Sequence, residues 1–151
     1  MKFLFTSEIN VPAEKAFELL LNKDNLKNWQ KELISYESLS GTPGEVGAVT
    51  KLKYKSVTII ETIISKDPPN ELVGYYEHKA GKKTILLHDT SNRFLSIGEN
   101  ITRFELEMQN VKFIGFLPKL MSKLMGRMFE KYHQNEVDQF KVLAEKTYST
   151  K

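Results

Sequence analysis

The chain has 151 residues, of which 40% are hydrophobic and 27% charged, and we expect residues 1–151 to form one globular domain. It contains no cysteine, which excludes disulfides, thiol nucleophiles and thiolate metal sites and favours a reducing compartment, so we expect a cytoplasmic protein. The formal charge of +3 is too small to indicate nucleic-acid binding. No signal-peptide pattern is visible, and no apolar run approaches the roughly 20 residues of a membrane span.

The N-terminal part predicts one strand followed by two short helices. Residues 2–11 alternate between the two faces of a strand, and Pro12 then suits the first turn of a helix over residues 13–21. Asp24 is placed to cap a second short helix. Trp29 lies on the apolar side of that helix, so we expect it to be buried near the sheet.

Six further strands are predicted between residues 33 and 113. Turn-forming Gly, Pro, Asn and Asp residues separate runs that are rich in β-branched and aromatic side chains. The short connections between the runs indicate antiparallel pairing. The runs are residues 34–39, 49–54, 57–64, 72–78, 83–90 and 101–109.

Two of these strands have a clear inner face. Leu52 and Tyr54 alternate with lysines, and Phe104, Leu106 and Met108 alternate with charged or amide side chains. We expect these five apolar or aromatic side chains to point toward the interior.

The direction of Glu61 depends on the turn that precedes its strand. A two-residue hairpin between Tyr54 and Val57 would pair these residues and turn Glu61 inward, where burial would raise its pKa. A register shifted by one residue would instead place Glu61 in water. The pattern leaves both alternatives open.

The C-terminal part predicts one long helix over residues 117–147. A first apolar stripe contains Met121, Met125 and Met128, and a second stripe is rotated by roughly 100° from it on a helix of about 3.6 residues per turn. The change falls near residues 133–136, so either the helix bends there or its two halves face different surroundings. Methionines suit a wall that adapts to varied ligands, although core packing explains them equally well.

A row of cations follows the same helix at every fourth residue. These cations, together with neighbouring apolar residues, are suited to weak contact with an anionic membrane surface. The more common explanation is the solvated face of the helix. The row consists of Lys119, Lys123, Arg127 and Lys131.

Strands followed by a helix, without β-α-β alternation, indicate the α+β class with an antiparallel sheet of six to seven strands. Several segments, in their order and spacing, resemble the polyketide cyclase/dehydrase-like branch of the START-like (SRPBCC) superfamily. The resemblance implies a helix-grip fold, in which a curved sheet closes on the C-terminal helix around a cavity, with two short helices after the first strand. The segments are residues 9–17, 26–29, 44–47, 67–69 and 98–102.

Few residues offer catalytic chemistry. No nucleophile elbow, phosphate-binding loop, dinucleotide fingerprint or zinc-protease motif is present. His78 and His88 lie on neighbouring predicted strands and could meet in the cavity as acid, base or polar anchor, but rim positions are the more common outcome. Tyr76 adds to the cavity wall if its strand turns that face inward. Glu130 and His133 have the spacing of a di-iron motif that lacks its second half, and a solvated helix face explains them better.

The sequence therefore predicts that the protein binds or transports a small hydrophobic, lipid-like or aromatic ligand between sheet and helix. The alternative is a cyclase- or dehydratase-type enzyme acting in the same cavity. We expect no cofactor, no metal and no recognisable catalytic residues, and the oligomeric state stays open. The candidate ligand-binding residues are Tyr54, Glu61, Tyr76, His78, His88, Phe104, Leu106, Met108, Met121, Met125 and Met128.

Overall fold

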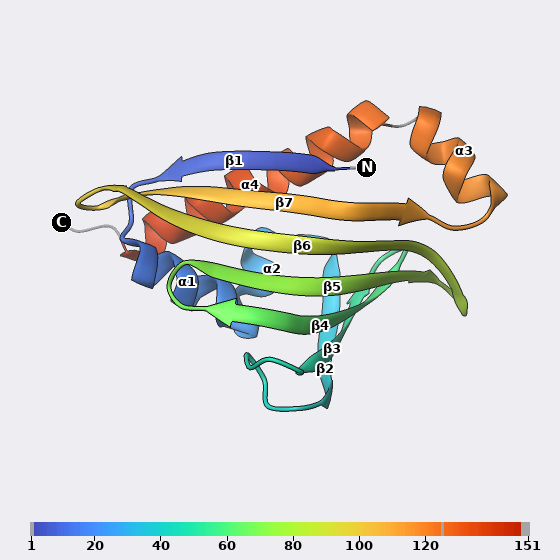
Figure 1. The fold of residues 1–151 in the computed structure, drawn as a ribbon, viewed down its shortest axis with the longest axis horizontal. Coiled ribbons are helices and arrows are strands. Elements are labelled where there is room, and N and C mark those ends of the chain that lie inside the picture. Colours follow the sequence, from blue (N-terminus) through green and yellow to red (C-terminus); the bar gives the residue numbers. More distant parts are fainter. Residues whose placement is uncertain (1, 125, 149–151) are drawn as a thin grey trace.

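The structure is a computed structural model that describes residues 2–124 and 126–148. Its framework is one curved sheet of seven antiparallel strands in the order β1-β7-β6-β5-β4-β3-β2 (Figure 1). The predicted α+β architecture is thereby confirmed. The strands are β1 (Phe3–Ile9), β2 (Leu33–Ser40), β3 (Val49–Tyr54), β4 (Thr58–Asp67), β5 (Glu71–Ala80), β6 (Lys83–Gly98) and β7 (Ile101–Phe113).

Short helical segments follow the first strand. Helix α1 (Ala13–Leu21) begins after Pro12, as predicted. The next turn is the 3-10 segment η1 (Lys23–Asn25), followed by α2 (Leu26–Trp29). Asn22, rather than Asp24, is the cap here, because its side chain accepts a hydrogen bond from the Asp24 backbone N–H at 3.1 Å.

Two helices cover the described residues of the predicted C-terminal helix. They are α3 (Phe116–Leu124) and α4 (Gly126–Tyr148), and α4 continues unbroken through residues 133–136. The junction of the two helices falls at residue 125, outside the described residues. Figure 1 shows α3 standing apart at one end of the sheet. The change of apolar stripe reflects different surroundings for the two parts, not a bend in α4.

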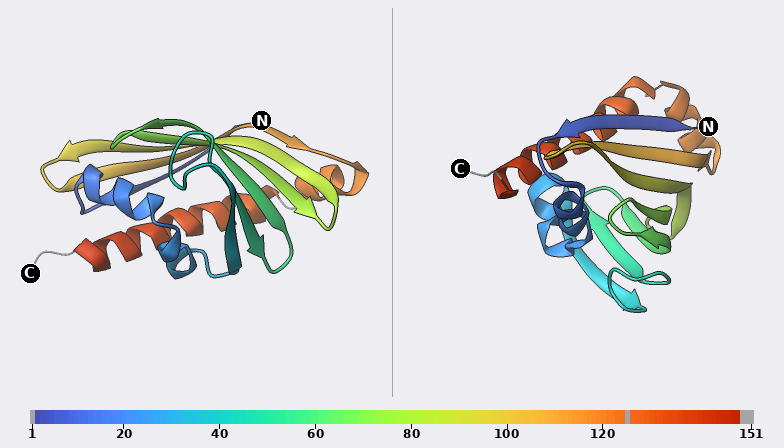
Figure 2. Two further views of the ribbon diagram at one scale, coloured as in Figure 1. Left: turned by 90° about the horizontal axis from the view of Figure 1, so that it is seen from below. Right: turned by 60° about the vertical axis from the view of Figure 1, so that its left-hand side comes forward.

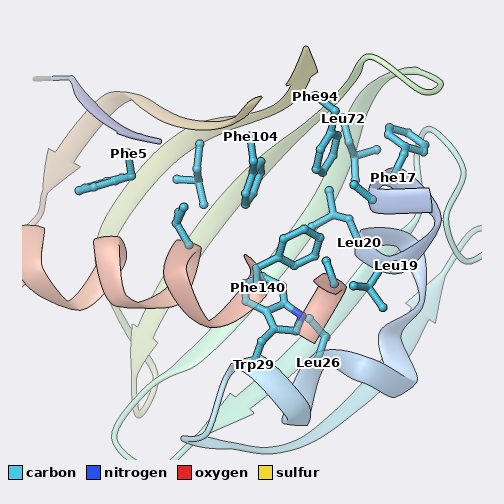
Figure 3. Packing of buried hydrophobic residues seen from close by; sticks show 14 of the residues in the cluster. Phe5, Phe17, Leu19, Leu20, Leu26, Trp29, Leu72, Phe94, Phe104 and Phe140 are labelled. Atoms are coloured by element: carbon cyan, nitrogen blue, oxygen red, sulfur yellow. The ribbon is translucent and has the colours of Figure 1, made fainter. Parts of the chain in front are cut away.

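The core lies between the concave face of the sheet and α4 (Figure 2). Phe94 and Phe104 stack with ring centroids 4.9 Å apart, and Phe140 of α4 packs against both. Trp29 is buried, as expected, and meets Phe140 edge-on at 5.2 Å (Figure 3). Val137 and Ala144 extend this buried side of α4. Among the described residues, no helix has the length and apolarity that crossing a membrane requires.

The β3–β4 hairpin determines which side chains of β4 face inward. The Tyr54 N–H donates to the Val57 carbonyl at 2.9 Å, and Leu52 pairs with Ile59. The two-residue turn considered from the sequence is therefore the one that forms. Because side-chain direction alternates along a strand, this register turns Glu61 toward the interior, where it is buried.

Candidate functional site

Two neighbouring cavities lie on the inner side of the sheet. The central cavity is lined by the sheet, the short helices and the middle of α4, and its volume is about 110 Å³. The apolar cleft lies between α3, the start of α4 and the ends of β6 and β7, and its volume is about 1050 Å³. The two spaces differ in size and also in the chemistry of their walls.

Glu61 anchors one end of the polar wall of the central cavity. Its carboxylate accepts a hydrogen bond from the Lys23 ammonium at 2.5 Å and another from the Tyr76 hydroxyl at 2.9 Å. Tyr76 is the direct cross-strand partner of Glu61 on β5, whereas Lys23 comes from the turn η1. A buried carboxylate requires such partners, so Lys23 supplies the counter-charge that allows Glu61 to stay inside.

A histidine pair continues this row onto β6. His88 pairs with Tyr76 across the strands, and their rings stack at 5.1 Å. The Nε2 atoms of His78 and His88 are 2.8 Å apart, and His88 Nδ1 lies 2.8 Å from the hydroxyl oxygen of Thr90. Glu61, Tyr76, His88 and Thr90 thus form a continuous polar row across three adjacent strands.

Both histidines are neutral near pH 7. Burial, followed by the effect of His88, lowers the pKa of His78 from 6.5 to about 3. Burial, followed by the effect of His133, lowers the pKa of His88 to about 4. In the Nε2–Nε2 contact one neutral ring must donate and the other accept. A change of tautomer, accompanied by rotation of the Thr90 hydroxyl, would reverse the direction of both hydrogen bonds.

Further polar groups complete the central cavity. The Tyr54 hydroxyl donates to the side-chain oxygen of Gln30, and burial, followed by the effect of Glu136, raises the pKa of that phenol. His133 Nδ1 lies 2.9 Å from a Glu136 carboxylate oxygen. Burial also raises the pKa of Tyr76 well above 10, with the Glu61 carboxylate as the second cause.

Trp29 contributes one donor without a partner. Its indole Nε1 is buried and makes no hydrogen bond to any of the described residues, although the residue lines the central cavity. An N–H group in this position is available to an acceptor that enters the cavity.

The apolar cleft has almost entirely hydrophobic walls. Phe113 and Phe129 face it from β7 and α4, and Leu86 faces it from β6. Met121 of α3 and Met128 of α4 complete its outer side. Lys83, Thr84 and Ser122 are the polar or charged side chains that contribute to this lining.

The sequence-derived candidates divide between the two cavities. Met121 and Met128 line the apolar cleft. Phe104 lines neither space, because it is fully buried in the aromatic core, and Met125 lies outside the described residues. The central cavity is lined by Tyr54, Glu61, Tyr76, His78, His88, Leu106 and Met108.

Sequence reasoning missed several polar members of the central cavity. The orienting partner of His88 is Thr90, which the two-residue spacing places on the same face of β6. His133 is partly buried, so the expected solvated face holds for Glu130 but is wrong for His133. No periodic sequence pattern marks Lys23 or Gln30, since Lys23 lies in the short segment η1 and Gln30 directly follows α2.

Within residues 2–124 and 126–148, no group of three or more His, Cys, Asp or Glu side chains is arranged to hold a metal ion.

Comparisons with known proteins agree with this architecture. A conserved protein from Geobacillus kaustophilus superposes with a TM-score of 0.79 at 11% identity, covering 97% of each chain. A protein from Thermus thermophilus superposes with a TM-score of 0.71 at 17% identity, covering 99% of this chain and 100% of that one. An HSP90 activator from Plasmodium falciparum superposes with a TM-score of 0.67 at 20% identity, covering 95% of each chain. At such identities these likenesses show the fold alone.

No curated protein matches the chain closely enough to count as a relative. In contrast, a family model described as polyketide cyclase/dehydrase and lipid transport matches residues 2–145, nearly the whole chain. This match agrees with the helix-grip arrangement of sheet and C-terminal helix. The chain therefore belongs to the polyketide cyclase/dehydrase and lipid transport family of the START-like superfamily.

Proposed function

We propose that the protein binds and carries a small hydrophobic molecule, lipid-like or aromatic, in the apolar cleft, and that it does so in the cytoplasm. The observation that supports this proposal is the cleft itself, about 1050 Å³ in volume and lined almost only by apolar side chains. Pockets for small organic ligands commonly measure about 300–1,000 Å³ and contain few polar groups.

The shape of the wall favours a ligand that is recognised by its apolar surface. The strand residues Leu86 and Phe113 provide a rigid floor, while Met121 and Met128 provide a flexible outer wall. Such a wall can adapt to ligands of different outline. The central cavity, at about 110 Å³, is too small for a ligand of this class.

The cleft and the central cavity are separated by one turn of α4. Phe129 lines the cleft, His133 lines the central cavity, and their rings are 4.5 Å apart. A ligand in the cleft would place its inner end against this pair. His133 in turn shares the central cavity with the polar row on β4, β5 and β6.

A second candidate function is a cyclase- or dehydratase-type reaction on a hydrophobic substrate. It is favoured by one observation, the meeting of His78, His88 and Glu61 inside the central cavity. The neutral imidazoles could pass a proton to or from a substrate group that displaced them from each other. At about 110 Å³ the central cavity would have to widen to admit a whole substrate, whereas the cleft already has about 1050 Å³.

Binding of a fluorescent fatty acid or a hydrophobic dye tests the carrier proposal. Met121→Trp combined with Met128→Trp adds bulk to the cleft wall, and we expect it to weaken dye binding by about tenfold, or about 1.4 kcal/mol. Val142→Trp is the matched control, because Val142 is exposed on α4 and lines neither cavity. Equal affinities for the double variant and the wild type would contradict ligand binding in the cleft.

The same assay separates the two candidate functions. His78→Gln combined with His88→Gln leaves the cleft unchanged, so a carrier should keep its dye affinity in this variant. An enzyme that uses the pair should instead lose turnover of its substrate while still binding the dye. Loss of dye binding in this folded variant would show that the ligand occupies the central cavity.

A further inference from the structure

Helix α3 exposes large apolar side chains that no described part of the chain covers. None of its residues is buried. Phe116 is 83% exposed, Leu124 is 72% exposed and Leu120 is 40% exposed. Neither Leu120 nor Leu124 lines the apolar cleft, so a ligand in that cleft would leave them uncovered.

The charged residues of α3 and of the segment around it in the chain are all of one sign. The segment 111–129 contains four cations and no Asp or Glu. Lys119 and Lys123 lie one turn apart on α3, in a strip adjacent to Leu120 and Leu124. The helix therefore combines an apolar strip with a cationic strip, the pattern of helices that lie in a lipid interface.

The start of β6, which contributes to the apolar cleft, is also basic. Lys83 lines the cleft from the start of β6, and Lys82 is exposed in the preceding turn. The nearby Glu77 carboxylate is engaged by Lys79 at 3.5 Å and by the Thr84 hydroxyl at 2.7 Å. Cations thus lie both on α3 and at the start of β6, whose Lys83 lines the cleft. Figure 2 shows α3 at one end of the sheet.

We propose that α3 docks this protein on an anionic lipid bilayer. Leu120 and Leu124 enter the interface, Lys119 and Lys123 contact lipid phosphates, and the apolar cleft then lies beside the membrane. A second copy of this chain fits the surface poorly, because a symmetric contact through α3 would bring two cationic segments together. The surface of an anionic bilayer can pair with the lysines and also accept the apolar strip.

Co-sedimentation with vesicles tests this proposal. One set contains phosphatidylcholine alone, and the other contains phosphatidylcholine partly replaced by phosphatidylglycerol. We expect the wild type to prefer the anionic vesicles, and added salt to weaken that preference. Lys119→Glu with Lys123→Glu should lower the affinity for anionic vesicles by about fivefold or more for each residue. Leu120→Ser with Leu124→Ser should reduce binding to both sets.

Matched variants on a distant face provide the controls. Lys51→Glu with Lys53→Glu makes the same change of charge on exposed positions of β3 and should leave vesicle binding close to wild type. Equal losses in the β3 and α3 charge variants would overturn the proposal. So would self-association of the wild type that the two leucine substitutions abolish without any change in vesicle binding.

The result is independent of ligand carriage. The four substituted residues of α3 do not line the cleft, so dye binding without vesicles should persist in both α3 double variants. If dye binding fails while vesicle binding is retained, the proposed function fails and membrane docking stands. The reverse outcome removes membrane docking alone.

Discussion

At the scale of single residues, the buried His78–His88 pair is the feature most open to measurement. Each ring is accommodated as the neutral form, because burial disfavours the imidazolium and the second ring lies within hydrogen-bonding distance. The stability of the folded protein is therefore linked to pH. In the unfolded chain both groups titrate near pH 6.5.

We predict that stability falls as the pH is lowered from 7 to 5. Both folded-state pKa values, about 3 and about 4, lie below 6.5, so the unfolded chain binds more protons throughout this range. At pH 5 the loss should reach about 2 kcal/mol for each histidine. Urea unfolding at pH 7 and at pH 5 measures this loss of stability. His78→Gln with His88→Gln should show a smaller change between the two pH values, and an unchanged difference would contradict the prediction.

At the scale of elements, α3 and α4 have different attachments to the rest of the fold. Val137, Phe140 and Ala144 hold α4 against the sheet, whereas α3 contributes no buried side chain. An element without buried apolar contacts opens at little cost in free energy. The outer wall of the apolar cleft is therefore its least stable part, which suits the entry of a ligand.

We predict that amide hydrogens of α3 exchange with solvent faster than those near Phe140. Hydrogen-exchange mass spectrometry should show this in the free protein, and a bound hydrophobic dye should slow exchange in α3 by contacting Met121. Peptides from α1 serve as the internal reference, since no residue of that helix lines the cleft. Equal protection of α3 and the middle of α4 would contradict this account.

At the scale of the whole molecule, the sheet and α4 cannot be in contact everywhere. The aromatic core around Phe94, Phe104 and Phe140 closes one part of the concave face (Figure 3). Side chains of the sheet and of α4 also line the small central cavity and the larger cleft, which that core leaves unfilled. The position of the aromatic core thus limits where a ligand can bind.

We predict that the protein purified under mild conditions retains a hydrophobic molecule. Native mass spectrometry should show a bound species that is lost on denaturation, because it is held without a covalent bond. Protein with Met121→Trp and Met128→Trp, prepared in the same way, should carry less of it. Retention of the same species at the same level by this variant would argue against the cleft as its site.

The sequence by itself determined the order of elements, the inner faces of β3 and β7, and the two directions open to Glu61. These are properties of local periodicity and turn chemistry, which neighbouring residues set among themselves. The helix predicted over residues 117–147 likewise agrees with α3 and α4, which cover the described residues of that range.

Only the tertiary structure decided which inward side chains meet. Lys23 reaches Glu61 from a turn 38 positions earlier in the chain, and His133 closes the central cavity from a helix whose charged pattern suggested solvent. It also decided that Phe104 belongs to the solid core and that Met121 faces open space. The physical reason is that the curvature of the sheet and the path of α4 across it set these distances, and neither is encoded in the spacing of any single segment.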